Sequence, residues 1–535
     1  MAGLSQEDLN IIKNHPLTNL IDNISQTTPP ASVPPFFDNS MSEIHDCTFQ
    51  DIKSFFDKYF ERKDWSSKAD AICQHILAPG SDSNSAQFSD PSTQDNVLAW
   101  WFHLQDLLTE SRSIYYTTAS KADLTDSSAE HQVNLLLRAR DGSPSRNKHL
   151  PTGWSQKSSS DWRDILVVGE LKKPKEKIGT KTTLLQISRC VRKIFAAQPT
   201  QQFVHAFIIC GTKMEAWVFD HSGLYSSGII DVYVDSRLFF QVLVGYTMMS
   251  DEELGLDTFI ARDEDGNKSI TVKGPGNSEE GKKLRLGKML SSPCAIVCRG
   301  TTCFLANDGQ VEGVAKFSWV SDKWRPEVEL LELADQKNVR GVIRIIGHSV
   351  ITSIADMRCG LTFDKRHNFK SAPPSTASSF HQSQPLTEPC HMDICRKSSS
   401  RKRRSPDKEL HEPSLFNRNG EEEELYDNRV LRCLVISPAG RPIYDYRSLL
   451  ELLTALRDAI KAHWSLYLDG NILHQDISEN NIIITDPDKA DGHSGMLIDL
   501  DLAEEVGSKC SDTGHQTGTK EFMAIEVLLN IDHTY

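Results

Sequence analysis

Three stretches near the end of this 535-residue chain carry side chains that could serve phosphoryl transfer. The first, His474 to Ile484, places Asp476 and Asn481 five positions apart on a loop that leads into an apolar strand. The second places Asp499 directly after the apolar residues 496–498. A carboxylate can orient an acceptor hydroxyl, while an amide oxygen and a second carboxylate are ligands that Mg²⁺ accepts. The spacing therefore predicts a site that handles a phosphoryl group and Mg²⁺.

The third stretch, Gly518 to Glu526, completes an order that is typical of protein kinases. That order runs His-x-Asp-x-x-x-x-Asn, then Asp-x-x, then Ala-x-Glu. Here it is carried by His474 to Asn481, Asp499 to Asp501 and Ala524 to Glu526. One such tripeptide says little by itself, but three in this order and at fitting separations indicate one site.

The preceding half of the domain should supply a lysine for the nucleotide phosphates and a loop that covers them. Lys316 is the one lysine of a short apolar strand. The helical segment that begins at Glu327 offers that residue as the ion-pair partner, with Glu329 as the rival. The candidate loop, residues 298–304, holds one glycine, Gly300. Few of its backbone N–H groups can therefore approach a phosphate closely.

Together these stretches resemble the fungal-type protein kinase family, over roughly residues 95–535. The resemblance implies a two-lobed kinase-like fold, Ser/Thr kinase activity that uses ATP and Mg²⁺, and a protein substrate. The motifs that carry it are Gly169 to Lys172, Arg299 to Thr301, Gly440 to Ile443, Glu451 to Leu453, Asp458 to Ile460, His474 to Ile482, Asp499 to Ala503 and Gly518 to Ala524.

Carried over residue by residue, the resemblance implies three catalytic residues. Asp476 would be the base, Lys316 would bind the nucleotide phosphates, and Glu327 would hold Lys316 in place. It also implies that Asn481 and Asp499 hold Mg²⁺.

The resemblance further implies the rest of the nucleotide site. Gly300 and Thr301 would lie beside Lys316 at the phosphates of ATP. The segment Leu434 to Ser437 would line the adenine hinge, with Val435 and Ser437 in contact with the nucleotide.

Three features depart from the kinase pattern. Gln475 stands where many kinases have an arginine that grips an activation-loop phosphate, so we expect that switch to be absent. Asp501 stands where the metal loop usually has glycine, and it either costs backbone freedom or adds a ligand. The chain ends nine residues after Glu526, which predicts an incomplete second lobe and an uncovered apolar face on the helix after Tyr444. The alternative is a pseudokinase or binding scaffold without catalysis.

A second candidate site lies where Glu170 and Lys172 end an apolar strand. Because the two residues are two positions apart on a strand, their side chains point to the same side of the sheet. This matches the Glu-x-Lys pattern of restriction-endonuclease-like nucleases. That chemistry needs a second carboxylate, and the preceding strand offers Asn134 instead. The sequence therefore favours an inactive nuclease-like fold or an unrelated sheet domain over a nuclease that acts on nucleic acid.

The elements that must position these residues predict an α+β protein. Residues 1–95 are polar, with one helix expected near 47–62. An α/β sheet domain is expected over 96–262, where a strand, a helix and two more strands follow one another. Residues 263–287 are rich in Gly, Lys and Glu, which is typical of a linker. The kinase-like domain would span 288–535.

Composition limits where the chain works. Its net charge of −14 argues against a protein that coats nucleic acid over its whole surface. No apolar run is long enough to cross a membrane, and the 12 scattered cysteines indicate reduced thiols. An intracellular protein of the nucleus or cytoplasm is expected. The basic cluster Arg396 to Arg404 could be a nuclear import signal, a nucleic-acid patch or part of a solvated linker.

That cluster belongs to a polar insert, residues 366–424, which has opposite charge blocks and no apolar periodicity. We predict that this insert is mobile and that its deletion leaves the fold intact. Hydrogen exchange and thermal unfolding of the deletion variant test this. Protected amides in the insert, or loss of the folding transition on deletion, would contradict it.

Overall fold

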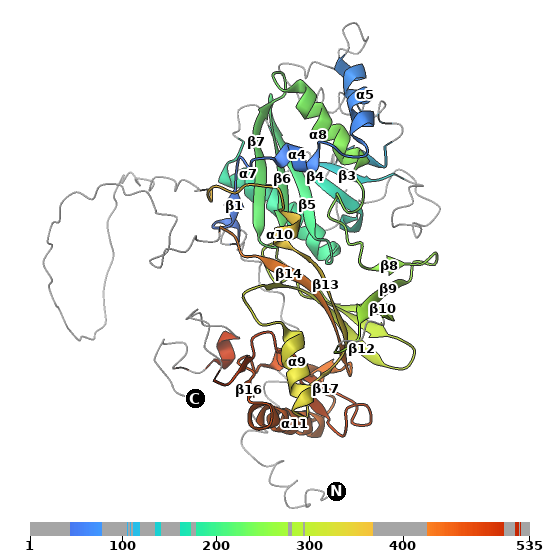
Figure 1. Cartoon of the computed structure of the whole chain (residues 1–535), viewed down its shortest axis with the longest axis vertical. Coiled ribbons are helices and arrows are strands. Elements are labelled where there is room, and N and C mark those ends of the chain that lie inside the picture. Colours follow the sequence, from blue (N-terminus) through green and yellow to red (C-terminus); the bar gives the residue numbers. More distant parts are fainter. Residues whose placement is uncertain are drawn as a thin grey trace, which may run out of the picture.

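The computed structural model describes residues 43–77, 104, 108, 111–117, 134–140, 161–172, 178–276, 281–292, 295–367, 425–507, 519–523 and 525. Figure 1 shows an N-terminal sheet domain, a strand barrel and a smaller unit around helix α11 (Leu449–Leu468), arranged in this order along the long axis. Almost all of the predicted insert, with the basic cluster, lies outside the described residues. Within them, no helix is both long and apolar enough to cross a membrane.

The N-terminal domain is built on a seven-stranded sheet in the order β1-β7-β6-β5-β4-β3-β2. An antiparallel meander, β2–β3–β4, leads through helix α7 into β5, which is parallel to β4. The strands are β1 (Thr48–Phe49), β2 (Ser113–Thr117), β3 (Asn134–Ala139), β4 (Ile165–Lys172), β5 (Phe203–Cys210), β6 (Lys213–Asp220) and β7 (Gly223–Asp231).

Helices cover both faces of this sheet, so its central strands are buried on both sides. Val168 and Ile208 face α7 (Lys181–Ala197), whereas their neighbours in sequence face α8 (Ser236–Met248). Thr180 caps α7 by accepting a hydrogen bond from the Thr183 N–H. Buried side chains recur along α7 at helical spacing and form one apolar stripe, namely Leu184, Ile187, Val191 and Ile194.

The helix predicted near 47–62 is much shorter than expected, because other elements share that range. Residues 48–49 form β1, and only α4 (Phe55–Tyr59) is helical before α5 (Ser66–Leu77) begins. Asp51 and Ser54 have φ angles of 58° and 63°, in the left-handed region that interrupts a right-handed helix. The aromatic residues there still pack into the core, so they fill it without one continuous helix.

The predicted linker at 263–287 is wrong. Strands β9 (Lys268–Lys273) and β10 (Gly281–Ser291) lie largely inside that range and pair as an antiparallel hairpin of the second sheet. The outward residues of this hairpin are mostly polar, which gives the segment its linker-like composition. The inward residues are buried and apolar, namely Ile270, Val272, Leu284 and Leu286.

This second sheet closes into a barrel. Its order is β10-β11-β12-β14-β13-β9-β8, and β10 pairs with β9 as well as with β11. The remaining strands are β8 (Ala261–Arg262), β11 (Thr302–Asn307), β12 (Glu312–Ser321), β13 (Arg344–Ser353) and β14 (Arg429–Ser437). Phe304, Phe317 and Val435 help to fill the interior. Side chains on alternate positions point outward, toward α9 (Glu327–Gln336) and the α11 unit.

Helix α11 packs its small residues against α9 and three short strands, β16 (Ile472–Leu473), β17 (Ile482–Ile484) and β18 (Gly495–Leu497). Gly495 lets β18 approach closely, because a Cβ there would lie 2.2 Å from the carbonyl oxygen of Ala455. The far face of α11 exposes large apolar side chains, including Leu450, Leu453, Ile460 and Trp464.

A buried ion pair joins the barrel to the N-terminal domain. Arg358, at the C-terminal end of α10 (Ile354–Met357), donates two hydrogen bonds of 2.8 Å to the carboxylate of Asp220 at the end of β6. The side chains of both residues are at most 1% exposed. Aromatic rings surround the guanidinium, with Tyr426 nearest at 4.3 Å from the ring centroid. The two domains are therefore fastened by a desolvated charge pair.

We predict that Asp220→Asn lowers the free energy of unfolding by about 3–5 kcal/mol, because it leaves a buried cation unpaired. Lys53 and Asp364 form an exposed ion pair at 2.8 Å between the same two domains, so Lys53→Ala is the matched control. The control should cost less than about 1 kcal/mol. Urea unfolding measures both variants, and equal losses would contradict the assignment.

Two fully buried histidines predict acid sensitivity. Burial lowers the pKa of His205 and of His221 to about 4. Unfolded histidine titrates near pH 6.5, so between about pH 6.5 and 4 the unfolded state binds more protons. The free energy of unfolding should therefore fall as the pH falls through this range, by up to about 3 kcal/mol per histidine. In the His221→Phe variant, the free energy of unfolding should fall less over this pH range, by about the contribution of one histidine. Urea unfolding at several pH values measures this, and a fall equal to the parent's would contradict it.

Candidate active site

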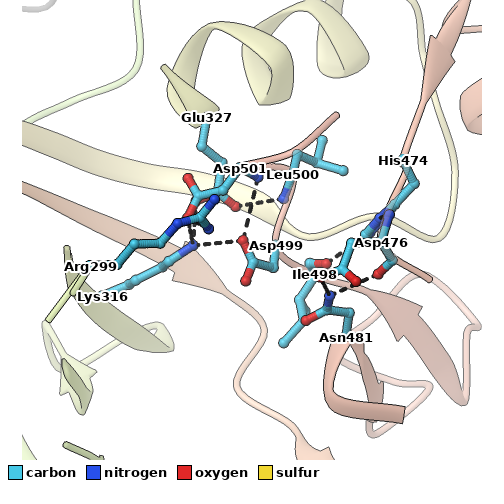
Figure 2. Close-up of polar contacts among 10 residues, drawn as sticks. All are labelled: Arg299, Lys316, Glu327, His474, Asp476, Asn481, Ile498, Asp499, Leu500 and Asp501. Atoms are coloured by element: carbon cyan, nitrogen blue, oxygen red, sulfur yellow. Dashed lines mark hydrogen bonds and ion pairs between the residues drawn. The ribbon is translucent and has the colours of Figure 1, made fainter. Parts of the chain in front are cut away.

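Four charged side chains converge between the barrel, α9 and the segment after β18 (Figure 2). The ammonium of Lys316 on β12 lies 2.8 Å from Glu327 Oε2, 3.0 Å from Asp499 Oδ1 and 2.8 Å from Asp501 Oδ2. Glu329, the rival partner of Lys316, pairs instead with Arg325 at 3.2 Å. One ammonium thus holds three carboxylates together.

Local structure explains this convergence. Lys316 lies between Ala315 and Phe317, which point into the barrel, so its own side chain points out toward α9. Glu327 opens α9, and its second oxygen accepts the Leu500 N–H at 3.0 Å. Asp499 has a φ of 64°, a left-handed conformation that aspartate tolerates better than most residues.

Burial and charge oppose one another in this cluster. Burial disfavours the charge on Lys316, but the three carboxylates outweigh it and hold the pKa of the ammonium well above its usual value. Burial raises the pKa of Glu327 to about 8, and Lys316 offsets this only in part. Burial also disfavours the charge on Asp499, yet Lys316 lowers the pKa of that carboxyl to about 2. Lys316 therefore holds Asp499 in its charged form more firmly than Glu327.

The second part of the site is the Asp476 carboxylate. The side-chain amide of Asn481 donates to Asp476 Oδ2 at 2.9 Å. Thr519 donates to Oδ1 through its backbone N–H at 2.7 Å and its hydroxyl at 2.8 Å. The carboxylate is thus oriented from both sides, and one of its bonds already comes from an aliphatic hydroxyl.

The segment before Asp499 ties the two parts together. The Ile498 N–H donates to the Asn481 carbonyl at 3.1 Å. His474 is fully buried, and its Nε2 lies 3.0 Å from the Ile498 carbonyl. Burial lowers the pKa of His474, so the neutral ring donates from Nε2 and orients the loop. Its Nδ1 accepts the Asp476 N–H at 3.4 Å.

The donor set fits Mg²⁺. The Asn481 amide donates through Nδ2, and no residue that the structure describes donates to its Oδ1. Asp499 is one-third exposed and uses Oδ1 for Lys316, which leaves Oδ2 as a hard oxygen ligand. Oxygen atoms of Glu327, Asp499 and Asp501 also lie within 4.8 Å of one another, but the Lys316 ammonium already occupies the space between them. Asn481 and Asp499 therefore each keep one oxygen atom that a cation could use.

A family model described as fungal protein kinase matches residues 146–535. The chain belongs to the fungal protein kinase family. A search among curated proteins finds no match.

Among solved structures, this fungal kinase family member is similar to the PK-1 kinase of Cydia pomonella granulovirus. The two share 12% sequence identity with a TM-score of 0.25, and the match covers 47% of this chain and 64% of the viral chain. The likeness is too slight to compare the two sites.

Two of the nucleotide residues expected from the family pattern do not face the cluster around Lys316. Val435 points into the barrel interior, so its side chain cannot line an adenine site. Leu434 and Ile436, its neighbours, face α9 and the α11 unit instead. Gly300 backs onto the N-terminal domain, because a Cβ there would lie 3.0 Å from His221 Cε1. Ser437 ends β14, where its hydroxyl donates to the Glu312 carbonyl at 3.3 Å.

Sequence reasoning left three polar residues of the site without a role. Asp501 was singled out only as an unusual replacement for glycine, yet it binds Lys316 directly. Arg299 lies 3.4 Å from Asp501, and Thr519 bonds Asp476. Arg299 and Thr519 lie inside motifs that carry the family resemblance, but no spacing rule assigns their partners. Thr301 precedes β11, and its hydroxyl makes no hydrogen bond to another residue that the structure describes.

The second candidate site, at Glu170 and Lys172, is buried. Glu170 and Lys172 form an ion pair at 3.1 Å with side chains 3% and 1% exposed, and Lys172 also bonds Gln186 of α7. Asn134 pairs with Glu170 through the backbone of β3 and β4. A pair this deeply buried contributes to the packing of α7 on the sheet, and no metal cluster forms there among the described residues.

Proposed function

We propose that this chain is an ATP- and Mg²⁺-dependent protein kinase that transfers the γ-phosphoryl group to a serine or threonine hydroxyl of a protein. The barrel with α9 and the unit around α11 would act as its two lobes. One observation carries the proposal: the Lys316 cluster and the Asp476 carboxylate are joined through the single segment 498–499 into one site.

Asp476 would orient the acceptor hydroxyl and accept its proton. Asn481 and Thr519 hold the carboxylate in a fixed direction, which meets the geometric requirement for such a base. Both Thr519 bonds go to Oδ1, so Oδ2, which accepts one bond from Asn481, is the oxygen left for an acceptor hydroxyl. Serine or threonine as the acceptor follows the usual assignment of the family.

Lys316 would bind the phosphates of ATP. In the structure its charge is shared among three carboxylates, so an incoming phosphate must replace one of them. Glu327 would keep hold of Lys316 during that exchange, because its second oxygen is fixed by the Leu500 N–H. Asn481 and Asp499 would hold Mg²⁺, which neutralises phosphate charge when bound.

For Glu170 and Lys172 we propose a structural role. Nuclease chemistry needs an accessible pair of carboxylates and a lysine free to position water. The burial of both side chains and the bonding of Lys172 to Gln186 argue against that access. The meander, helix and parallel strand of this domain remain compatible with an inactive nuclease-like fold.

Two substitutions separate the roles in the kinase site. Asp499→Ala should abolish Mg²⁺-dependent ATP binding, because it removes the carboxylate that the cation needs. Asp476→Ala should leave ATP binding near the parent's and lower phosphoryl transfer by about 10²–10⁴-fold, the usual contribution of a positioned base. Binding is measured by titration calorimetry, and transfer with labelled ATP and a generic protein substrate.

Glu329→Ala is the matched control, since Glu329 lies on the same helix as Glu327 but half-exposed and away from Lys316. It should behave like the parent in both assays. If the Asp476 and Asp499 variants bind Mg-ATP and transfer phosphate like the parent, the assignment fails. If the parent protein binds Mg-ATP but transfers no phosphate, the alternative of a pseudokinase or binding scaffold without catalysis would be favoured.

A further inference from the structure

The loop that joins β10 to β11 lies where a kinase covers the nucleotide phosphates, yet three of its described backbone N–H groups are already used. The N–H groups of Ile296 and Val297 both donate to the Glu43 carboxylate, the latter at 2.8 Å. The N–H of Gly300 donates to the Cys298 sulfur at 3.2 Å. The loop therefore cannot offer these donors to a phosphate, which is how glycine-rich loops act.

One side chain of this loop does reach the site. Arg299 Nη1 lies 3.4 Å from Asp501 Oδ2, the same oxygen that Lys316 approaches at 2.8 Å. Figure 2 shows the Arg299 and Lys316 side chains running together toward the carboxylates. The Arg299 side chain is 40% exposed, so it is open to a ligand. The long contact to Asp501 leaves most of its five N–H donors for a new partner.

We propose that Arg299 binds the β- and γ-phosphates of the nucleotide and replaces the missing glycine-rich loop. This inference rests on the proposed kinase function. A guanidinium presents paired donors that match two phosphate oxygens, whereas a lysine offers a single point of charge. Arg299 and Lys316 together would place two positive charges at the phosphates, and Arg299 would exchange Asp501 for phosphate on binding.

The N-terminal domain holds Arg299 in position. Ile296 inserts into the core of that domain beside α7 and is fully buried. Glu43, which fixes the loop backbone, is itself paired with Arg192 of α7. The Arg299 carbonyl accepts the Trp319 N–H at 2.6 Å.

Two aromatic rings that flank Gly300 also help to hold the loop in place. Trp319 of β12 stacks on His221 of the N-terminal domain, with ring centroids 5.3 Å apart. Gly300 passes against both rings, where a Cβ would lie 3.0 Å from His221 Cε1 and 3.1 Å from Trp319 Cδ1. Its φ of 56° also favours glycine. The sheet domain would thus form one wall of the nucleotide site by fixing the loop that carries Arg299.

The test compares Arg299→Met and Arg299→Lys with the parent in titrations with ATP, ADP, AMP and adenosine. Arg299→Met should weaken ATP and ADP binding by about 10- to 100-fold and leave adenosine binding unchanged. Arg299→Lys should recover part of the loss, because it restores charge without the paired donors. Arg325→Met is the control, since Arg325 is equally exposed at 41% but pairs with Glu329 and Glu505 on the outer surface. It should bind every nucleotide like the parent.

Each outcome decides the matter. If the parent binds ATP and Arg299→Met binds ATP equally well, the role of Arg299 is overturned while the kinase proposal stands. An equal loss for adenosine and ATP would assign Arg299 to folding and overturn the role as well. If the parent binds none of the four compounds, both proposals fail. If Arg299→Met is unfolded without nucleotide, the Arg299→Lys variant decides instead. Should Arg299→Lys bind ATP as tightly as the parent, with the same preference for ATP over AMP, the proposed two-donor contact of the guanidinium with the phosphates would be overturned.

Discussion

A single buried ammonium organises the functional half of this protein. Lys316 comes from the barrel, Glu327 from the helix beside it, and Asp499 and Asp501 from the segment that leads out of the α11 unit. Three carboxylates in so small a buried space would repel one another without that charge. The ion cluster therefore fixes how the barrel, α9 and the α11 unit sit together, and the proposed nucleotide site lies where they meet.

The N-terminal domain extends this arrangement. Its buried ion pair between Asp220 and Arg358 fastens it to the barrel, and its core accepts Ile296 from the loop next to Lys316. A loop poor in glycine cannot wrap a phosphate by itself. Held against a rigid sheet domain, it can instead direct one arginine at the site. Sheet domain and kinase-like domain would then work as one nucleotide-binding unit.

Motifs with fixed chemistry were predictable from sequence. The spacing of Asp476, Asn481 and Asp499 predicted their neighbourhood, because each lies close to the end of a short apolar strand that has to be buried. The hairpin at 268–291 was missed, since its polar outer face dominates the composition and barrel closure depends on strands far apart in sequence. Barrel closure also decides that the Val435 side chain points into the barrel interior, which the sequence pattern did not predict. The partners of Arg299 and Asp501 depend on three elements meeting, which no local pattern encodes.

The central claim is that ATP enters by taking Lys316 from one of its carboxylates. A crystal structure of the whole chain with Mg²⁺ and a non-hydrolysable ATP analogue tests it most directly. The account predicts phosphate oxygens on Lys316 and Arg299, Asp501 released from at least one of these cations, Glu327 still paired with Lys316, and Mg²⁺ on Asn481 and Asp499. A nucleotide bound elsewhere, or an unchanged Lys316 cluster beneath it, would contradict the account.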